Sequence, residues 1–387
     1  MAIELFEGCS LCSQKELEEL TRVKDEFNLK GKIVSVIRKK EGRINGTLAI
    51  TTSTETDGFE RHIFQTINVD VFKHPVELMN NINLVTSHIR DKGMMTLYVH
   101  PVKTKTSESP FIYFDKETGK FWRVYNYIES TVKNSVESSS DMYILGKELG
   151  KFSSLLDDFD VSLLTEPIPG FHDTRKRYSA FVAIMTNDLS CFGRVRSLTC
   201  MKEIEFILQR SEKVSLIMDA LKFKMIPFRV SHNDPKLNNV LFDPSTGEVI
   251  CLVDLDTVGP GSVLYDFGDA ARFACNTESE EAVSVENVSF DVERFTALTR
   301  GLLESMKETI TEKEVELLVD SVWMMTFELV LRFLTDHIDG NHYFGVEYDG
   351  KNLERARVQL ALLTDIEAKY DKLQKIVQEI WNEVKKS

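Results

Sequence analysis

One segment of the chain combines carboxylate, amide and ammonium side chains at a spacing suited to phosphoryl transfer. It reads SHNDPKLNNVLFD, then a turn PSTGE, then VICLVDLDT. Asp234 precedes the first apolar stretch, Asn239 closes that loop, and Asp254 follows the second apolar stretch. Apolar residues at 240–242 and 249–253 predict two short strands joined by a turn. Because an antiparallel pair returns the chain to its starting end, we expect Asn239 and Asp254 to face each other.

The side chains of this segment match the needs of phosphoryl transfer from ATP. Mg²⁺ prefers oxygen ligands, usually one or two from the protein together with substrate phosphates, and Asn239 and Asp254 supply such oxygens. A separate carboxylate must hold the attacking hydroxyl, and Asp234 is predicted to be that base. Lys236 can direct its ammonium group at the transferring phosphoryl group. The alternative is a polar loop whose Asn and Asp side chains cap turn amides; the combined spacing favours catalysis.

The front part of the chain, which must position these residues, is expected to be mainly strands. Helical spacing occurs only at 11–27 and at 74–91, where a proline stands at the helix start. Stretches rich in β-branched and aromatic residues predict strands at 31–40, 46–52, 62–72, 94–102 and, on both sides of a DKETGK turn, 111–128.

The back part of the chain is expected to be mainly helices around the strand-rich segment at 224–257. A polar, serine-rich stretch at 130–141 is the candidate boundary between the two parts. Gly146 and Gly150 have G-x-x-x-G spacing, but the surrounding charges exclude a membrane helix. A period of 3.6 residues predicts helices at 141–157, 174–188, 197–221, 288–307, 312–335 and 351–384.

Composition limits the possible partners and compartments. A chain of 387 residues is long enough for two domains. Its formal net charge of −14 repels phosphate backbones and anionic lipid, so we expect no nucleic-acid partner and no membrane partner. The six scattered cysteines indicate reduced thiols, and the N-terminus lacks the apolar core of a signal peptide. We therefore expect a cytoplasmic protein, and the oligomeric state is left open.

The segment with Asp234 resembles the protein-kinase catalytic loop H-x-D-x-K-x-x-N, followed by a metal-binding Asp on the next hairpin. Those positions are His232, Asp234, Lys236, Asn239 and Asp254. The chain differs from protein kinases, because VDLDT replaces the Asp-Phe-Gly motif and no Ala-Pro-Glu segment follows. This combination resembles the superfamily of aminoglycoside phosphotransferases and choline kinases, which phosphorylate small molecules.

Within that superfamily, several stretches resemble N-acetylhexosamine 1-kinases, and they follow in the expected order over most of the chain. The stretches are HIFQTINVDVFKHPVELMNNI, WRVYNYIEST, IPGFHDTRKRY, SHNDPKLNNVLFD, VDLDTVGPGSVLYDFGDAARF, LRFLTDHIDGNHYF and KNLERARVQLALLTDIEAKY.

The resemblance implies an α+β, two-lobed, protein-kinase-like fold. A nucleotide-binding lobe at 1–129, with a mostly antiparallel sheet, would precede a largely helical lobe at 130–387 that contains the catalytic hairpin and the acceptor site. The implied activity is ATP-dependent phosphorylation of the C1 hydroxyl of N-acetylhexosamines, with Mg²⁺ as cofactor. Asp234 would be the base, and Asn239 and Asp254 would hold the metal ion.

The nucleotide side of the resemblance is less complete. The strand position of the kinase lysine corresponds to Gln65, which is not cationic, and Lys73 lies beyond the predicted strand. The segment 42–46 contains two glycines and is either a phosphate-covering loop or a plain hairpin turn. The resemblance implies adenine contacts with the backbone of Tyr127, Ile128 and Glu129.

The acceptor sugar is implied to lie under the helical lobe, in contact with Asp234, Phe273, Arg332 and Tyr343. Rigid guanidinium donors suit a sugar pocket, and Arg332 would disfavour a polycationic acceptor. Two alternatives stay open. One is a kinase of another small alcohol, such as another sugar, an amino alcohol or an aminoglycoside. The other, suggested by the missing strand lysine, is a nucleotide-binding regulator without catalysis.

Overall fold

The structure is a computed structural model that describes residues 13–39, 44–54, 58–93, 99–105, 110–133, 135–186 and 199–387. The chain forms two compact units. Unit 1 comprises Met1–Thr131, Ser162–Pro169 and Leu241–Gly259, and unit 2 comprises Val132–Val161, Gly170–Val240 and Pro260–Ser387.

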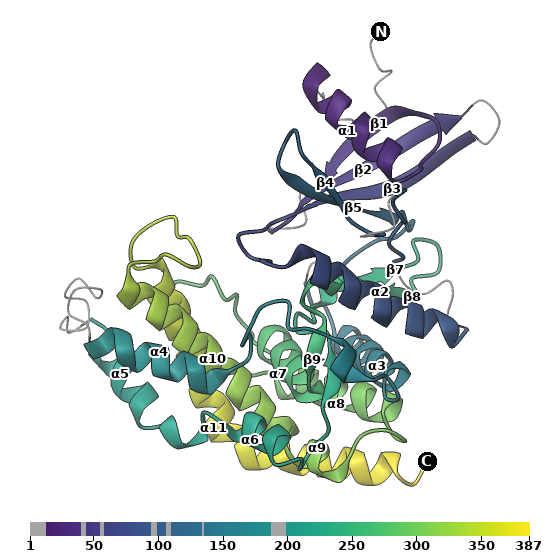
Figure 1. Ribbon diagram of the computed structural model, residues 1–387. Helices are drawn as coiled ribbons and strands as arrows, with labels where there is room; N and C mark the ends of the chain where they lie inside the picture. The colour runs from purple at the N-terminus through teal and green to yellow at the C-terminus, as the bar shows by residue number, and fades with distance from the viewer. Residues whose placement is uncertain are drawn as a thin grey trace. The chain divides into compact units, whose positions relative to one another are not determined.

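Unit 1 is built on a five-stranded sheet in the order β1-β2-β3-β5-β4, with every neighbouring pair antiparallel (Figure 1). Side chains alternate between the faces of a strand, so the apolar residues Leu48, Phe64 and Val124 line one face together. Gln65 and Arg123 lie opposite each other on the other face. The strands are β1 (Lys32–Lys39), β2 (Gly46–Thr54), β3 (Gly58–Ile67), β4 (Tyr113–Asp115) and β5 (Lys120–Asn126).

Two helices complete unit 1. Helix α1 (Gln14–Glu26) packs its buried Leu20 and Val23 onto the apolar face of the sheet. Helix α2 (Pro75–Asp91) carries the buried Asn81, whose amide nitrogen donates to the carbonyl oxygens of Thr165 at 2.7 Å and Val258 at 2.9 Å. One buried side chain therefore holds both later segments of the chain in unit 1.

Unit 2 consists mainly of helices, with α10 and α11 packed along each other (Figure 1). In the described parts of the chain, no helix is both long and apolar enough to cross a bilayer. The helices are α3 (Ser139–Leu155), α4 (Thr174–Thr186), α5 (Met201–Leu208), α6 (Leu216–Lys222), α7 (Val263–Ala274), α8 (Val292–Ser305), α9 (Glu312–Glu316), α10 (Leu318–Asp339) and α11 (Lys351–Val384).

The expected α+β kinase-like fold is confirmed, although some elements differ from the prediction. Helix α7 was not expected, because Gly268 interrupts its pattern. The structure needs that glycine, since a Cβ there would lie 2.5 Å from the Ser321 carbonyl oxygen of α10. The single helix expected at 197–221 is two helices, α5 and α6. Of the strand expected at 94–102, only residues 99–102 are described, and they form one isolated bridge, between Pro101 and Tyr125.

The strand-rich segment forms two small two-stranded sheets. The predicted hairpin consists of β7 (Val240–Phe242) and β8 (Val249–Leu252), and the Asp243 carboxylate accepts backbone N–H bonds from Ser245 and Thr246 to close its turn. Strands β6 (Arg229–Ser231) and β9 (Gly259–Gly261) form the second sheet.

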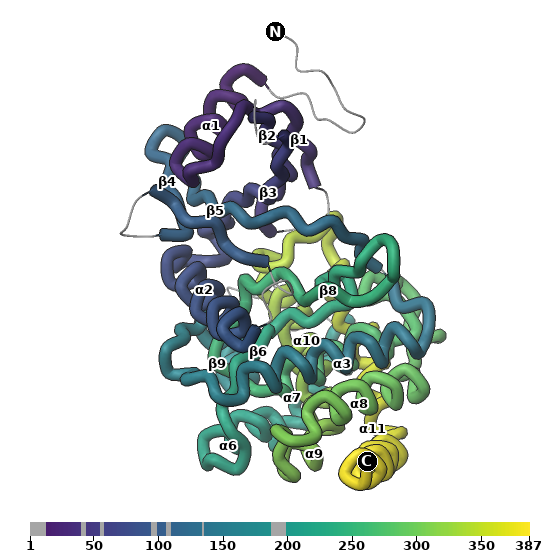
Figure 2. Tube along the Cα trace, turned by 90° about the vertical axis from the view of Figure 1, so that its right-hand side faces the viewer, coloured from purple at the N-terminus to yellow at the C-terminus, as the bar shows by residue number. Residues whose placement is uncertain are grey.

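Glycines let α3 and α8 pack closely (Figure 2). A Cβ on Gly146 would lie 2.1 Å from the Leu298 carbonyl oxygen, and a Cβ on Gly301 would lie 2.2 Å from the Tyr143 carbonyl oxygen. Gly150 meets α8 in the same way, with Leu302 oxygen at 2.7 Å. The G-x-x-x-G spacing therefore serves helix packing inside unit 2.

Replacing Gly301 by alanine tests this packing, because close packing reverses the sign of the expected change in the free energy of unfolding. In an exposed helix, Gly→Ala stabilises by about 1 kcal/mol. We expect Gly301→Ala to destabilise the protein instead by about 1–3 kcal/mol, because α3 and α8 must separate. Urea unfolding of the intact chain measures the difference, and a stabilised variant would contradict the close contact.

Candidate active site

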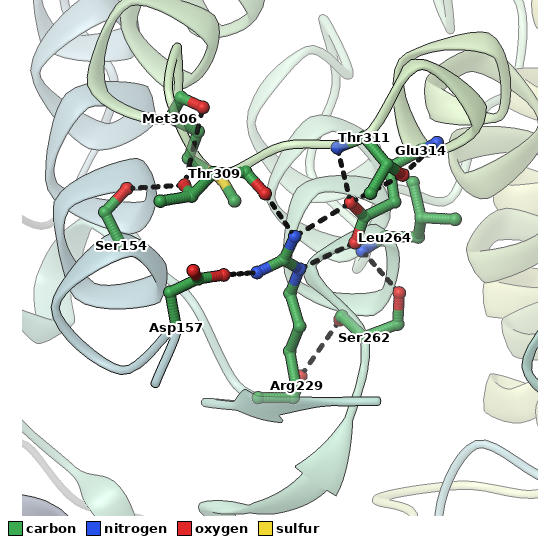
Figure 3. Close-up of polar contacts among 10 residues, drawn as sticks. Ser154, Asp157, Arg229, Ser262, Leu264, Met306, Thr309, Thr311 and Glu314 are labelled. Carbon is green, nitrogen blue, oxygen red and sulfur yellow. Dashed lines mark hydrogen bonds and ion pairs between the residues drawn. The ribbon is translucent and has the colours of Figure 1, made fainter. Parts of the chain in front are cut away.

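A buried ion cluster anchors the strand that leads into the catalytic loop (Figure 3). The Arg229 side chain at the start of β6 donates from Nε to Glu314 at 2.7 Å and from Nη2 to the Thr309 carbonyl oxygen at 2.6 Å. Asp157 pairs with its other terminal nitrogen. Glu314 also completes the N-terminal capping box of α9. The same side chain therefore connects β6 to the first turn of α9.

The carboxylate of Asp266, in the first turn of α7, fixes the residues that follow β6. It accepts bonds from the Ser231 hydroxyl at 2.9 Å, the His232 N–H at 2.9 Å and the Asn233 N–H at 2.7 Å. Asn233 has a φ of 63°, in the left-handed region. A strained residue of this kind persists where its surroundings over-determine the backbone, which these bonds do.

Asp234, Lys236 and Asn239 come together in this loop. The Asp234 carboxylate lies 2.5 Å from the Lys236 ammonium, and the side chains are 29% and 34% exposed, so a substrate can reach them. The Asn239 amide nitrogen donates to the Asp234 carbonyl oxygen at 2.9 Å. That bond engages the amide nitrogen and leaves the oxygen as the atom suited to a divalent cation. Buried His232 accepts a bond from the Asp234 N–H at Nδ1, as expected for a residue that braces the loop.

Asp254 belongs to unit 1 and follows β8 by two residues. Its backbone is left-handed, with φ 64° and ψ 54°, which is uncommon for a residue other than glycine. The short 3-10 helix η4 (Leu255–Thr257) begins directly after it. The chain therefore turns sharply at the predicted metal ligand.

A buried arginine that the sequence analysis missed holds this turn. Arg123 of β5 donates from Nη2 to Asp256 at 2.8 Å and from Nε to Gln65 at 3.0 Å. Asp256 also accepts a bond from the Asn45 amide, whose oxygen accepts the Asn68 N–H at 2.9 Å. The network joins the sheet, the segment after Asp254 and the end of the β1–β2 turn within unit 1.

Arg123 is the cation that lies beside the position of the kinase lysine. It pairs with Gln65 across β3 and β5, and its side chain is only 2% exposed. Burial lowers the pKa of Arg123, but the charge of Asp256 outweighs that effect and raises it above its usual value. The available signal was a cation in the middle of the apolar strand FWRVYN, where an ion partner is required.

The predicted adenine-binding residues directly follow β5. Arg61 pairs with Glu129 at 2.8 Å, and its guanidinium lies 5.3 Å from the centre of the Tyr127 ring. The Ile128 carbonyl oxygen accepts a bond from the Ser130 hydroxyl at 3.1 Å. Nucleotide contacts by these residues, and by Gln65, stay a prediction. Of the segment 42–46, for which a phosphate-covering loop and a plain hairpin turn were both open, residues 42 and 43 lie outside the described residues.

Two of the predicted acceptor residues meet in unit 2. Arg332 of α10 has its guanidinium 5.7 Å from the centre of the Tyr343 ring, and its Nη2 lies 3.5 Å from the tyrosine oxygen. Phe273 is an exposed residue of α7. One turn before Arg332, fully buried Glu328 faces its guanidinium at 3.8 Å. Glu328 is a second residue that the sequence analysis did not single out.

The donor chemistry of Asn239 and Asp254 suits magnesium, since both offer hard oxygen atoms. Across the described residues there is no cluster of three or more His, Cys, Asp or Glu side chains able to hold a metal ion. Mg²⁺ in kinases takes only one or two protein ligands and completes its shell with phosphates and water, so each of these side chains offers an oxygen of the kind that the ion uses.

Unit 1 contains a cavity of about 380 Å³ whose lining includes Asn45. It is bounded by Glu16, Glu19 and Leu20 of α1 and by Leu48 and Trp122 of the sheet. The apolar face that α1 covers is opposite the face with Gln65 and Arg123. We therefore do not assign the cavity to nucleotide.

Removing the charge of Arg123 tests the network around Asp256. We expect Arg123→Met to lower the free energy of unfolding by about 3–5 kcal/mol, because Asp256 would remain buried without its cation. In Arg123→Met/Asp256→Asn, which removes both charges, most of that loss should be recovered. Urea unfolding of the intact chain compares them; equal losses in the single and double variants would show that the pairing is not the cause.

Comparison with known families supports a phosphotransferase. Residues 115–288 match the family described as "Phosphotransferase enzyme family". The matched range contains the catalytic loop with Asp234, the hairpin, Asp254 and the segment 127–129. Gln65, Arg332 and Tyr343 lie outside it.

Solved structures share the fold at low sequence identity. An aminoglycoside phosphotransferase from Alicyclobacillus acidocaldarius subsp. acidocaldarius DSM 446 is 13% identical with a TM-score of 0.53, and the match covers 90% of this chain and 92% of that one. A microcompartment-associated aminopropanol kinase is 11% identical with a TM-score of 0.58, covering 92% and 98%. A Plasmodium vivax ethanolamine kinase is 13% identical with a TM-score of 0.54, covering 90% of each.

These similarities and the braced loop agree on the type of protein. The fold is that of two-lobed kinases, and the matched family consists of phosphotransferases. A regulator without catalysis, left open by the missing strand lysine, is therefore not retained. The match over residues 115–288 and the shared kinase-like fold indicate a phosphotransferase that acts on a hydroxyl acceptor.

Proposed function

We propose that this enzyme transfers the γ-phosphoryl group of ATP to the C1 hydroxyl of an N-acetylhexosamine and produces the sugar 1-phosphate. The observation that carries the proposal is the partly exposed pair of Asp234 and Lys236, 2.5 Å apart, in a loop fixed by Asp266. Phosphoryl transfer needs a base for the acceptor hydroxyl and a cation for the negative charge of the phosphoryl group. Asp234 and Lys236 supply these two groups at a position that a substrate can reach.

Asp234 acts as the base toward the acceptor. Its carboxylate accepts the proton of the C1 hydroxyl as the oxygen attacks the γ-phosphorus. An anomeric hydroxyl is more acidic than an ordinary alcohol, so a carboxylate can serve as its base. Lys236 is one residue beyond Pro235 and directs its ammonium group at the phosphoryl oxygens, where negative charge is present throughout the transfer.

The nucleotide contacts belong to the residues that the sequence predicts for them. Tyr127, Ile128 and Glu129 contact the adenine, with Gln65 on the neighbouring strand. Asn239 and Asp254 hold Mg²⁺ through oxygen atoms. When bound, the ion neutralises the phosphate charge and keeps the γ-phosphoryl group oriented. The side chains of Arg123 and Asp256 hold the turn at Asp254 and do not themselves contact the nucleotide.

The charges of unit 2 favour a neutral acceptor over an amine. A polyamine or choline site needs acids that are free to meet a cation, or an aromatic cage. Here Glu328 faces Arg332, Asp269 is bound by Arg272 at 2.8 Å, and Glu280 is bound by Arg355 at 2.7 Å. Each of these acids already has a cationic partner. Phe273, Arg332 and Tyr343 therefore line a pocket for a sugar.

The Asp234→Asn substitution tests the assignment of the base. We expect turnover to fall by about 10²–10⁴-fold, because the variant cannot accept the acceptor proton. Nucleotide binding, measured by calorimetry with ADP and Mg²⁺, should stay close to that of the unaltered enzyme. Asp371→Asn, an exposed residue of α11, is the matched control and should keep full activity. Retention of most activity in Asp234→Asn would remove Asp234 as the base.

Product analysis tests the acceptor and the position of phosphorylation. The enzyme is incubated with Mg²⁺, ATP and, separately, N-acetylhexosamines, hexoses, an amino alcohol and an aminoglycoside, and ADP release is followed. Mass spectrometry and phosphorus NMR then locate the phosphate. We expect a 1-phosphate of an N-acetylhexosamine. A 6-phosphate would overturn the position, and turnover only with amines would support the alternative of an amino-alcohol or aminoglycoside kinase.

A further inference from the structure

A buried carboxylate in unit 2 gathers several side chains of the acceptor region around itself. Glu328 accepts a bond from the Thr174 hydroxyl at 3.2 Å and lies 3.3 Å from Nε of Arg177. His172 Nδ1 lies 3.4 Å from the same carboxylate, and Arg332 lies 3.8 Å away. Burial raises the pKa of Glu328, but these neighbours outweigh it and hold the pKa at about 2, so the carboxylate is ionised.

Two nitrogen atoms of this cluster are buried and have no hydrogen-bond partner. They are Nε2 of His172 and Nε of Arg332. The His172 side chain is only 8% exposed. A buried polar atom without a partner costs about 1–3 kcal/mol, so such atoms at a binding site indicate a partner supplied by a ligand.

The hydrogen-bonding role of each atom follows from its surroundings. Arg332 is always protonated, so its Nε is a donor. The His172 ring faces Glu328 through Nδ1 at 3.4 Å. In the tautomer whose Nδ1–H donates to that carboxylate, the lone pair of Nε2 is available as an acceptor.

The two atoms belong to one small region. Both side chains contact Glu328, and both lie against Phe171, with a ring distance of 4.5 Å for His172 and 5.4 Å for the Arg332 guanidinium. The His172 ring also stacks on Tyr265 at 4.9 Å. These aromatic rings give the region apolar walls beside one acceptor atom and one donor atom.

The region lies close to the catalytic loop. Burial raises the pKa of Asp269, but the charge of Arg272, and then that of Lys236, lower it below the usual value. Asp269 is therefore within electrostatic reach of Lys236, which pairs with Asp234, and the His172 ring lies within the same reach of Asp269.

We propose that His172 Nε2 and Arg332 Nε, positioned by Glu328, bind the acetamido group of the acceptor. An acetamide offers one N–H donor and one carbonyl acceptor, the complement of the two unpartnered atoms, and its methyl group suits the aromatic walls. This assignment rests on the proposed function and adds the group by which the enzyme distinguishes an N-acetylhexosamine from a hexose. Glu328 is a positioning residue that contacts no substrate.

Substitutions of His172 separate recognition from structure. His172→Asn keeps an amide N–H near Glu328 and lacks the atom at Nε2, whereas His172→Phe keeps only the ring stacking. For both variants we expect the ratio of kcat/KM for N-acetylhexosamine to kcat/KM for the matching hexose to fall by about 10-fold or more, with KM for ATP unchanged. Exposed His74→Asn is the matched control and should leave the ratio unchanged.

The ratio is informative because a general loss of stability lowers kcat/KM for both substrates by the same factor and leaves the ratio unchanged. An unchanged ratio in His172→Asn and His172→Phe, with N-acetylhexosamine turnover present in the unaltered enzyme, would overturn the acetamido assignment and leave the proposed function intact. Equal use of hexose and N-acetylhexosamine by the unaltered enzyme would also overturn it. Absence of turnover on any sugar would overturn the proposed function itself, and the acetamido assignment with it.

Discussion

Each unit of this enzyme contains an arginine that is buried against a carboxylate close to a functional loop. Arg123 meets Asp256, two residues after the proposed metal ligand, and Arg229 meets Glu314 at the start of the strand that leads to the catalytic loop. A charge removed from water is tolerated only when it is paired and hydrogen-bonded. Because few alternative arrangements satisfy that condition, each pair fixes the backbone beside it.

The fixed backbone accounts for the unusual conformations at the site. Asn233 and Asp254 both have left-handed φ angles. Asn233 lies beside the proposed base, and Asp254 is the proposed metal ligand. Asp266 holds the first turn with backbone hydrogen bonds, and the Arg123–Asp256 pair holds the segment after the second. Bonds to buried charged side chains therefore hold these two residues in their unusual backbone conformations, and the short loops alone do not.

The same principle applies to acceptor selection. The Glu328 carboxylate is paired with two arginines and a histidine. The proposed acceptor region therefore presents directed hydrogen-bonding atoms instead of an unpaired anion. A kinase of amino alcohols or aminoglycosides would need the opposite arrangement. Charge pairing inside unit 2 is therefore the basis for proposing an uncharged, amide-bearing acceptor.

Short-range spacing was sufficient to predict the hairpin and the proximity of Asp234, Lys236 and Asn239, because bonds over two to five residues bring these three together. Strand alternation and helical period likewise predicted most elements of the fold. Long-range pairing was not accessible in this way: Asp256 is 133 positions from Arg123, and Glu328 is 156 positions from His172. Such partners depend on how strands and helices are ordered in space, and a local pattern carries no information about that order. For the same reason, helix α7 and the glycine contacts between α3 and α8 could be identified only from the packing of the helices in the tertiary structure.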